Sequence, residues 1–128
     1  MYHVAVNSVK ETEMKIKTFE EVPNNPVDME GAVNVKMRLL LSQDDGADHF
    51  VMRMFEIAPG GHTPLHAHDW EHEIYVLEGQ GIITLEGQEY SLTPGHVLLV
   101  PVGKEHQFKC TDPKLFRFLC IVPATAQG

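Results

Sequence analysis

The stretch HAHDWEHE, residues 66–73, gathers side chains that can bind a metal ion, with three of the eight histidines of the chain beside three acidic residues. On a β-strand alternate side chains share one face, so His66 and His68 can both reach a single ion. His72 follows four residues later. If residues 69–71 form a small loop, His72 can begin the next strand and face the same point.

A fourth ligand has to come from another part of the chain, and the best candidate is His106, which lies in PVGKEHQF at the start of a later β-rich segment. Four neutral imidazoles suit first-row metals such as Mn, Fe, Co, Ni, Cu or Zn. A His-x-His pair is also common on polar surface loops. From the spacing alone, a metal site and a solvated loop therefore both remain open.

The segments that must position these histidines have the pattern of short strands, bounded by Gly, Pro and Asp residues. No long segment shows the 3.6-residue period of a helix. Eight or more strands at this spacing predict an all-β sandwich, barrel or jelly roll, with a hairpin around Gly79-Gln80-Gly81. The expected strands are 32–42, 49–58, 72–79, 81–87, 88–92, 96–101, 106–110 and 115–123.

With 128 residues the chain is predicted to form one domain. We expect residues 1–30 to be an N-terminal arm with an edge strand at 14–22 and a loop at 23–31. Residues 31–128 would form the barrel. An arm of this kind can add a strand to a partner subunit.

The net charge of −8 and the scattered basic residues argue against a nucleic-acid partner or an anionic membrane surface. No apolar run approaches the roughly 18 residues that span a bilayer, and the N-terminus lacks a signal-peptide pattern. We therefore predict a cytoplasmic protein without a membrane partner. In a reducing compartment the two cysteines, Cys110 and Cys120, are not expected to form a disulfide.

Two stretches resemble the metal-binding motifs of the cupin superfamily. The first reads Gly, five residues, His-x-His, three or four residues, Glu, six residues, Gly. The second reads Gly, five residues, Pro-x-Gly, two residues, His, three residues, Asn. The matching positions are Gly60, His66, His68 and Gly79 in the first, and Gly95, Pro101, Gly103 and His106 in the second.

The chain departs from this pattern twice. His72 occupies the slot of the glutamate, three residues after His68 and six before Gly79, and Cys110 occupies the slot of the asparagine. The resemblance therefore implies a four-histidine site of His66, His68, His72 and His106, similar to the small manganese-binding cupins. It also implies a single-domain, double-stranded β-helix (jelly-roll) barrel and a homodimer. Manganese is the favoured ion, and Fe, Ni, Zn, Co and Cu remain alternatives.

Four neutral imidazoles would leave the full charge on a divalent ion, so the site should favour an anionic further ligand. An octahedral ion held by four protein ligands keeps two adjacent open positions. These would suit a bidentate substrate or dioxygen.

Three further residues are candidates for the pocket. Arg53 lies on an otherwise apolar strand. If its side chain points inward it can bind an anion, and if it points outward it can pair with an acidic residue on the surface. By resemblance, Phe118 and Cys120 look into the metal cavity. Cys120 would then be an oxidisable thiol near the metal, or otherwise a small core residue.

Some neighbouring side chains have weaker assignments. Glu71 and Glu73 either accept hydrogen bonds from ligand imidazoles or are solvated loop acids. His62 is expected at the rim of the pocket rather than on the metal. Trp70 is expected to pack against the barrel mouth or a dimer contact.

These features favour a metal-dependent enzyme of the oxygenase type, a dioxygenase or other oxidoreductase. Its small substrate would carry a carbonyl, enol or catechol-like oxygen. A non-catalytic binder or sensor of a small molecule is one alternative. A metal-dependent isomerase or lyase, in which the ion acts only as a Lewis acid, is another. One fold hosts all three, so the fold does not decide between them.

Overall fold

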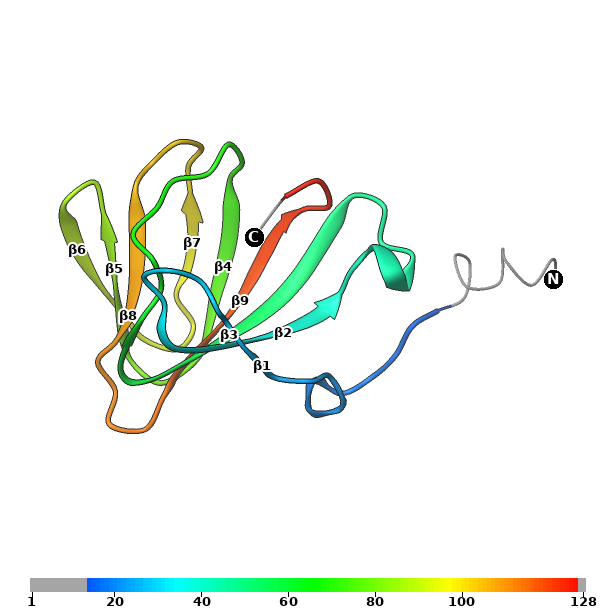
Figure 1. Ribbon diagram of the computed structural model, residues 1–128, viewed down its shortest axis with the longest axis horizontal. Helices are drawn as coiled ribbons and strands as arrows, with labels where there is room; N and C mark the ends of the chain where they lie inside the picture. Colours follow the sequence, from blue (N-terminus) through cyan, green and yellow to red (C-terminus); the bar gives the residue numbers. More distant parts are fainter. Residues whose placement is uncertain (1–13, 127–128) are drawn as a thin grey trace, which may run out of the picture.

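A curled antiparallel sheet of nine strands forms most of the molecule in this computed structural model, which describes residues 14–126. Figure 1 shows its strands closing around an interior, as expected for a jelly-roll barrel. The strands are β1 (Asn25–Pro26), β2 (Val33–Leu41), β3 (Phe50–His62), β4 (His72–Glu78), β5 (Gly81–Leu85), β6 (Gln88–Leu92), β7 (Val97–Val100), β8 (His106–Cys110) and β9 (Phe116–Pro123), with 3-10 turns η1 (Phe19–Glu21) and η2 (Gln43–Asp45).

The order of strands is β6-β5-β8-β3-β9-β4-β7, and β2 pairs with β3 and β1. Strand β3 runs four residues beyond its predicted end at residue 58. Most of it pairs with β2 and β9, and His62 at its end pairs with both Val33 of β2 and Lys109 of β8. One long strand thus joins two walls that we name here: the β8 wall (β6, β5, β8) and the β9 wall (β9, β4, β7), which flank the interior in Figure 1.

The predicted hairpin around Gly79-Gln80-Gly81 is wrong, because β4 pairs with β7 and β9 whereas β5 pairs with β6 and β8. This connection passes between the two walls. Gly79 has φ +79°, and a Cβ there would lie 1.8 Å from the carbonyl oxygen of Leu115, so no larger residue fits. The tight hairpin joins β5 to β6 through Glu86 (φ 47°) and Gly87 (φ 84°).

The predicted edge strand at 14–22 is also wrong. This segment contains only the turn η1, and the first strand, β1, lies within the predicted loop. Contacts of the Phe19 ring explain the difference, since the Arg38 and Arg117 guanidinium carbons lie 5.2 and 5.3 Å from its centroid. Side-chain packing against the outer face replaces a hydrogen-bonded ladder here. Residues 1–13 of the expected arm lie outside the described residues.

The core fills the interior between the two walls. The alternation predicted for the last strand is confirmed, because Phe116, Phe118, Cys120 and Val122 are all buried. Ile57 and Val76 are fully enclosed on neighbouring strands. Across residues 14–126, none of the helical segments is long and apolar enough to cross a membrane.

Candidate metal centre

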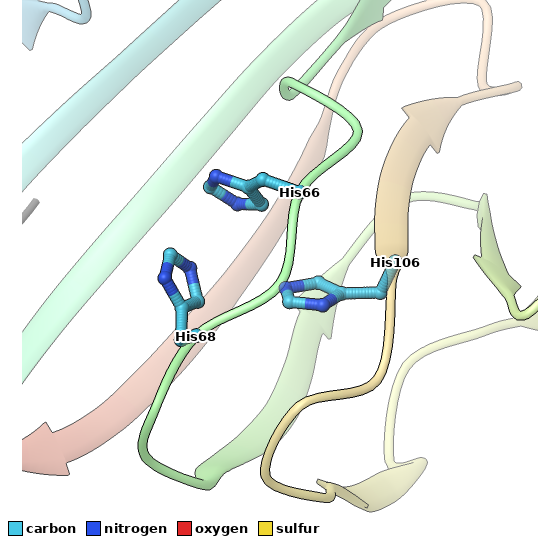
Figure 2. A group of neighbouring side chains, drawn as sticks. All are labelled: His66, His68 and His106. Carbon is cyan, nitrogen blue, oxygen red and sulfur yellow. The ribbon is translucent and has the colours of Figure 1, made fainter.

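Three of the four predicted ligands form one cluster. His66 and His68 project from the connection between β3 and β4, and His106 projects from the start of β8 (Figure 2). One ligand atom from each lies within 4.8 Å of the others. That is close to the separation at which imidazole nitrogens, each roughly 2.1 Å from an ion, can share it.

Backbone hydrogen bonds hold two members of this cluster together. The His66 amide donates to the His106 carbonyl (3.1 Å), and the His106 amide donates to the His66 carbonyl (2.9 Å). The Thr63 hydroxyl accepts a bond from the Phe108 amide (2.9 Å), which anchors the start of the same connection. The β8 wall therefore fixes His66 and His106 through the main chain.

His72, the first residue of β4, lies beside the cluster on the β9 wall. Its ring centroid is 4.9 Å from those of His68 and His106, and the side chain is 5 % exposed. Its Nε2 atom is buried and has no hydrogen-bond partner among the described residues. An orphaned imidazole nitrogen is costly unless something binds it, so His72 fits a ligand role.

All four imidazoles are held in the neutral form that metals require. Burial, together with the smaller effect of neighbouring histidines, lowers the pKa of His72 to about 3 and that of His68 to about 4. Burial also lowers the pKa of His66 and His106, although the Lys104 carbonyl opposes this effect at His106. Their lone pairs are therefore free for coordination at neutral pH.

Two of the rings have partners that fix their orientation. His106 Nδ1 lies 2.9 Å from the Lys104 carbonyl oxygen, so it carries the proton and leaves Nε2 for a ligand bond. The His68 ring stacks on Trp70 at 4.6 Å with an interplanar angle of 10°. Trp70 thus packs beside the histidine cluster, as one of its two predicted positions requires.

The histidines open into a cavity of about 90 Å³. His66, His68 and His72 line it. Val27 and Met29, from the connection between β1 and β2, also contribute to the lining. Sequence reasoning missed this contribution, because residues 23–31 have the composition of an ordinary loop. The aromatic lining consists of Phe55, Phe108 and Phe118.

Arg53 points inward and is 7 % exposed, which decides between its two predicted orientations. Its guanidinium carbon lies 5.3 Å from the centroid of the Phe55 ring, and Nη2 lies 3.5 Å from Cys120 Sγ. Phe118 and Cys120 also line the cavity, as the resemblance implied. Phe118 stacks on Phe55 with ring centroids 5.4 Å apart. Their roles in binding or chemistry remain predictions.

Two acidic residues near the histidines, Glu71 and Glu73, lie in solvent-exposed positions. Glu73 lines a groove on the outer face of β4 and β7. Strand alternation puts it on the face opposite His72, so it cannot orient that ring. His62 lies outside the cluster, 3.3 Å from the Gln107 side chain, consistent with a position off the metal.

An antiparallel jelly-roll barrel is an architecture found among cupins, and here it holds a partly buried histidine cluster. Residues 53–122 match the family described as "Cupin domain". The chain therefore belongs to the cupin family.

Three relatives illustrate the range of this family. The polyketide cyclase RemF from Streptomyces resistomycificus is 39 % identical with a TM-score of 0.83, over 87 % of this chain and 80 % of that one. The oxalate-binding protein of Thermotoga maritima is 30 % identical over 87 % of this chain and 94 % of its own length. The 1-methylthio-D-xylulose 5-phosphate methylsulfurylase of Rhodospirillum rubrum is 32 % identical over 57 % of this chain, which spans only 47 % of that protein.

Proposed function

We propose that the chain is a metal-dependent enzyme that acts on a small anionic substrate rich in oxygen. His66, His68, His72 and His106 would hold a divalent ion, and Arg53 would bind the negative charge of the substrate. The observation that carries this proposal is the charge of the cavity. Among the described residues that line it, Arg53 is the only charged side chain and none is a carboxylate.

Four neutral imidazoles do not cancel the charge of a divalent ion, and Arg53 adds another positive charge nearby. A carboxylate or enol oxygen is therefore the preferred ligand. A bound ion would supply Lewis-acid chemistry by polarising a carbonyl or enol oxygen. The aromatic lining of Phe55, Phe108 and Phe118 would exclude water from the reacting end of the substrate.

The space available suggests how a substrate would enter. The metal cavity of about 90 Å³ accommodates only a small molecule or the reactive end of a larger one. A neighbouring groove of about 370 Å³ shares Met37 and Arg53 with it, and Leu39, Val51 and Val122 contribute apolar surface. A longer substrate would place its anionic or enolic end beside Arg53 and its apolar body in the groove.

The sequence favours an oxygenase, but the reactions named for two relatives favour a different reaction class. RemF is a polyketide cyclase and the Rhodospirillum protein is a methylsulfurylase, and neither name denotes an oxygenase. We therefore propose Lewis-acid chemistry of the cyclase, isomerase or lyase type first. Dioxygen chemistry is the second reaction class, supported by the adjacent open positions that four ligands would leave on an octahedral ion.

The test is a turnover assay with metal-loaded protein against 1,3-diketones, 2-oxo acids and catechols, in air and without oxygen. Product formation at equal rates in both atmospheres would support Lewis-acid catalysis. Consumption that stops without oxygen would support the oxygenase. Binding of these compounds with no turnover in either atmosphere would sink the enzyme proposal.

The role of Arg53 is tested by Arg53→Gln. Loss of its charge should weaken binding of an anionic substrate by about tenfold to a hundredfold, as for other charge-assisted contacts. Arg38→Gln is the matched control, because Arg38 lies in a partly buried position near Glu56 and is not among the residues that line the cavity. Equal affinities for the two variants would contradict the assignment of Arg53.

A non-catalytic binder of a small dicarboxylate is the second candidate function. Similarity to the Thermotoga oxalate-binding protein over nearly its whole length supports this alternative, as does the small cavity. Calorimetry with oxalate distinguishes it. Tight, metal-dependent binding of oxalate, combined with no turnover of any compound above, would favour the binder.

The ion itself is proposed to be manganese, on the resemblance of the motifs to four-histidine cupins. Zn, Fe, Ni, Co and Cu are compatible with the same donor set. Elemental analysis of protein purified without a chelating tag, before any metal is added, tests this choice. Recovery of zinc alone would support Lewis-acid chemistry and count against manganese.

We also propose a homodimer formed through the outer face of β4 and β7. Strand β7 pairs only with β4 in the described sheet, so its other edge is available to a second copy. Tyr75, Val97 and Leu99 on this face are 48, 69 and 56 % exposed beside a groove of about 520 Å³. Light scattering should show that Leu99→Glu yields monomers, whereas Phe50→Glu, at an exposed site on β3, stays dimeric.

A further inference from the structure

Cys120 connects two functional candidates that lie on different strands. It sits on β9, between β3 and β4, and its backbone is paired with Arg53 on one side and Ile74 on the other. Its Sγ atom lies 3.5 Å from Arg53 Nη2 and 3.6 Å from His72 Nδ1. Arg53, Cys120 and His72 are 7, 2 and 5 % exposed, so all three members of this row are buried.

The two nitrogens of His72 have very different surroundings. Nδ1 faces the Cys120 sulfur, whereas Nε2 is buried without a hydrogen-bond partner in the described part of the chain. A neutral imidazole carries a single proton, on one nitrogen or the other. If Nε2 is to offer its lone pair to an ion, Nδ1 must carry that proton and needs an acceptor.

His106 has the same division of roles but a different acceptor. Its Nδ1 lies 2.9 Å from the Lys104 carbonyl oxygen, a main-chain group that cannot be replaced by substitution. At His72 the corresponding acceptor would be a side-chain sulfur, which is weaker and larger than a carbonyl oxygen. The orientation of His72 therefore depends on one substitutable atom.

We propose that Cys120 is a positioning residue whose sulfur accepts a hydrogen bond from His72 Nδ1 and a second from Arg53. This arrangement fixes the His72 tautomer with its lone pair on Nε2. It also ties the anion-binding Arg53 to the same atom that orients the fourth ligand. The consequence for metal affinity rests on the proposed function, but the tautomer of His72 does not.

Simple core filling is the competing explanation for Cys120, since buried cysteines often pack as small hydrophobes. Three substitutions separate the two roles. Cys120→Ala and Cys120→Val remove the acceptor while leaving an apolar side chain, and Cys120→Ser keeps an acceptor. Cys110→Ala is the matched control, because Cys110 is a buried cysteine on β8 whose thiol contacts the Asp112 carbonyl instead of a histidine.

The decisive measurement is nitrogen NMR of histidine-labelled, metal-free protein, which reports the tautomer of His72 directly. We expect a protonated Nδ1 in the wild type and in Cys120→Ser and Cys110→Ala, and a shift toward protonated Nε2 in Cys120→Ala and Cys120→Val. A wild-type protein with the proton on Nε2 would overturn the proposal, even if every variant failed to fold.

Metal affinity provides the second readout, measured by competition with a chelator. Removing a group that orients a metal-bound histidine weakens metal binding by about tenfold to a hundredfold. We expect this loss in Cys120→Ala and Cys120→Val and its recovery in Cys120→Ser. Unchanged affinity and tautomer in folded Cys120→Ala would refute the role of Cys120. If the wild type bound no metal at all, the proposed function would fail, while NMR would still decide the tautomer.

Discussion

The two walls of the barrel hold their histidines by different means. On the β8 wall, backbone bonds join His66 to His106 and a backbone carbonyl orients the His106 ring. On the β9 wall, no main-chain group of residues 14–126 bonds to the His72 ring, and its Nδ1 faces the side chain of Cys120. The first arrangement depends on the fold of the chain, whereas the second depends on the identity of individual residues.

This difference suggests how the site divides its tasks. His106 of β8 and the two histidines of the β3–β4 connection, His66 and His68, form a group whose ligand atoms already lie within 4.8 Å of one another. The β9 wall adds His72, and the adjoining strand β3 carries Arg53, the residue that would meet the substrate. The affinity for the metal would then depend mostly on His66, His68 and His106, whereas His72 and Arg53 would adjust the properties of the site.

The largest effect should come from removing a histidine of the three-residue cluster. We expect His106→Ala to weaken metal binding by more than about a hundredfold, because it deletes a ligand that the backbone holds in place, an effect beyond that of losing an orienting partner. His72→Ala should cost less, since the cluster of His66, His68 and His106 remains. Affinity is measured by competition with a chelator.

His62→Ala is the control for these variants, because His62 lies outside the cluster. Its affinity should match that of the wild type. If His72→Ala lost as much metal affinity as His106→Ala, the two histidines would contribute equally to metal binding, which would contradict the proposed difference between the walls. If His72→Ala lost none, His72 would not be a ligand.

Sequence reasoning succeeded for the cluster of three histidines, and the reason is physical. His66, His68 and His106 lie at fixed offsets from the glycines and proline of their turns, and such local spacing is visible in a sequence. Strand alternation likewise predicted that Phe118 and Cys120 share a buried face.

Contacts between distant segments could not be predicted in this way. Gly79 looked like a hairpin turn because two β-rich runs flank it, but the chain crosses between walls there. The acceptors near His106 and His72 are the Lys104 carbonyl and the Cys120 sulfur, rather than Glu71 or Glu73. Both depend on tertiary packing and not on nearness in sequence.

The next effect concerns the metal-free protein in mild acid. Burial lowers the pKa of His72 to about 3 and of His68 to about 4, against about 6.5 in an unfolded chain. Below pH 6.5 these histidines become protonated in the unfolded chain but stay neutral in the folded protein. The free energy of unfolding should therefore fall as the pH drops toward 4. Urea unfolding at several pH values measures this slope.

Carboxylates also titrate in this range, so the contribution of the histidines is isolated by comparison. His72→Ala should show a shallower loss of stability between pH 6.5 and 4 than the wild type. Parallel slopes for the two proteins would mean that the His72 imidazole takes up its proton as readily in the folded state as in the unfolded chain.

A smaller effect should follow from disturbing the main-chain support of the β8 wall. Thr63→Val removes the hydroxyl that accepts from the Phe108 amide and leaves a buried donor unsatisfied, which costs about 1–3 kcal/mol. Thr84→Val is the matched control, because the Thr84 hydroxyl is buried without a partner in the described residues. Chemical denaturation should show a loss for the first variant and none for the second. Equal losses would show that methyl packing matters here rather than the hydrogen bond.

The smallest expected effect tests the two faces of β4. Glu73 follows His72 immediately, yet it points to the outer groove with Tyr75 while His72 points to the interior. Glu73→Gln should therefore change metal affinity by less than about twofold, compared with the tenfold to hundredfold loss typical of a residue that orients a ligand. Chelator competition measures this, with Cys120→Ala as the variant that should respond. A tenfold loss of metal affinity in Glu73→Gln would show that the Glu73 carboxylate orients a ligand. In that case Cys120 would not be the residue that distinguishes the β9 wall from the β8 wall.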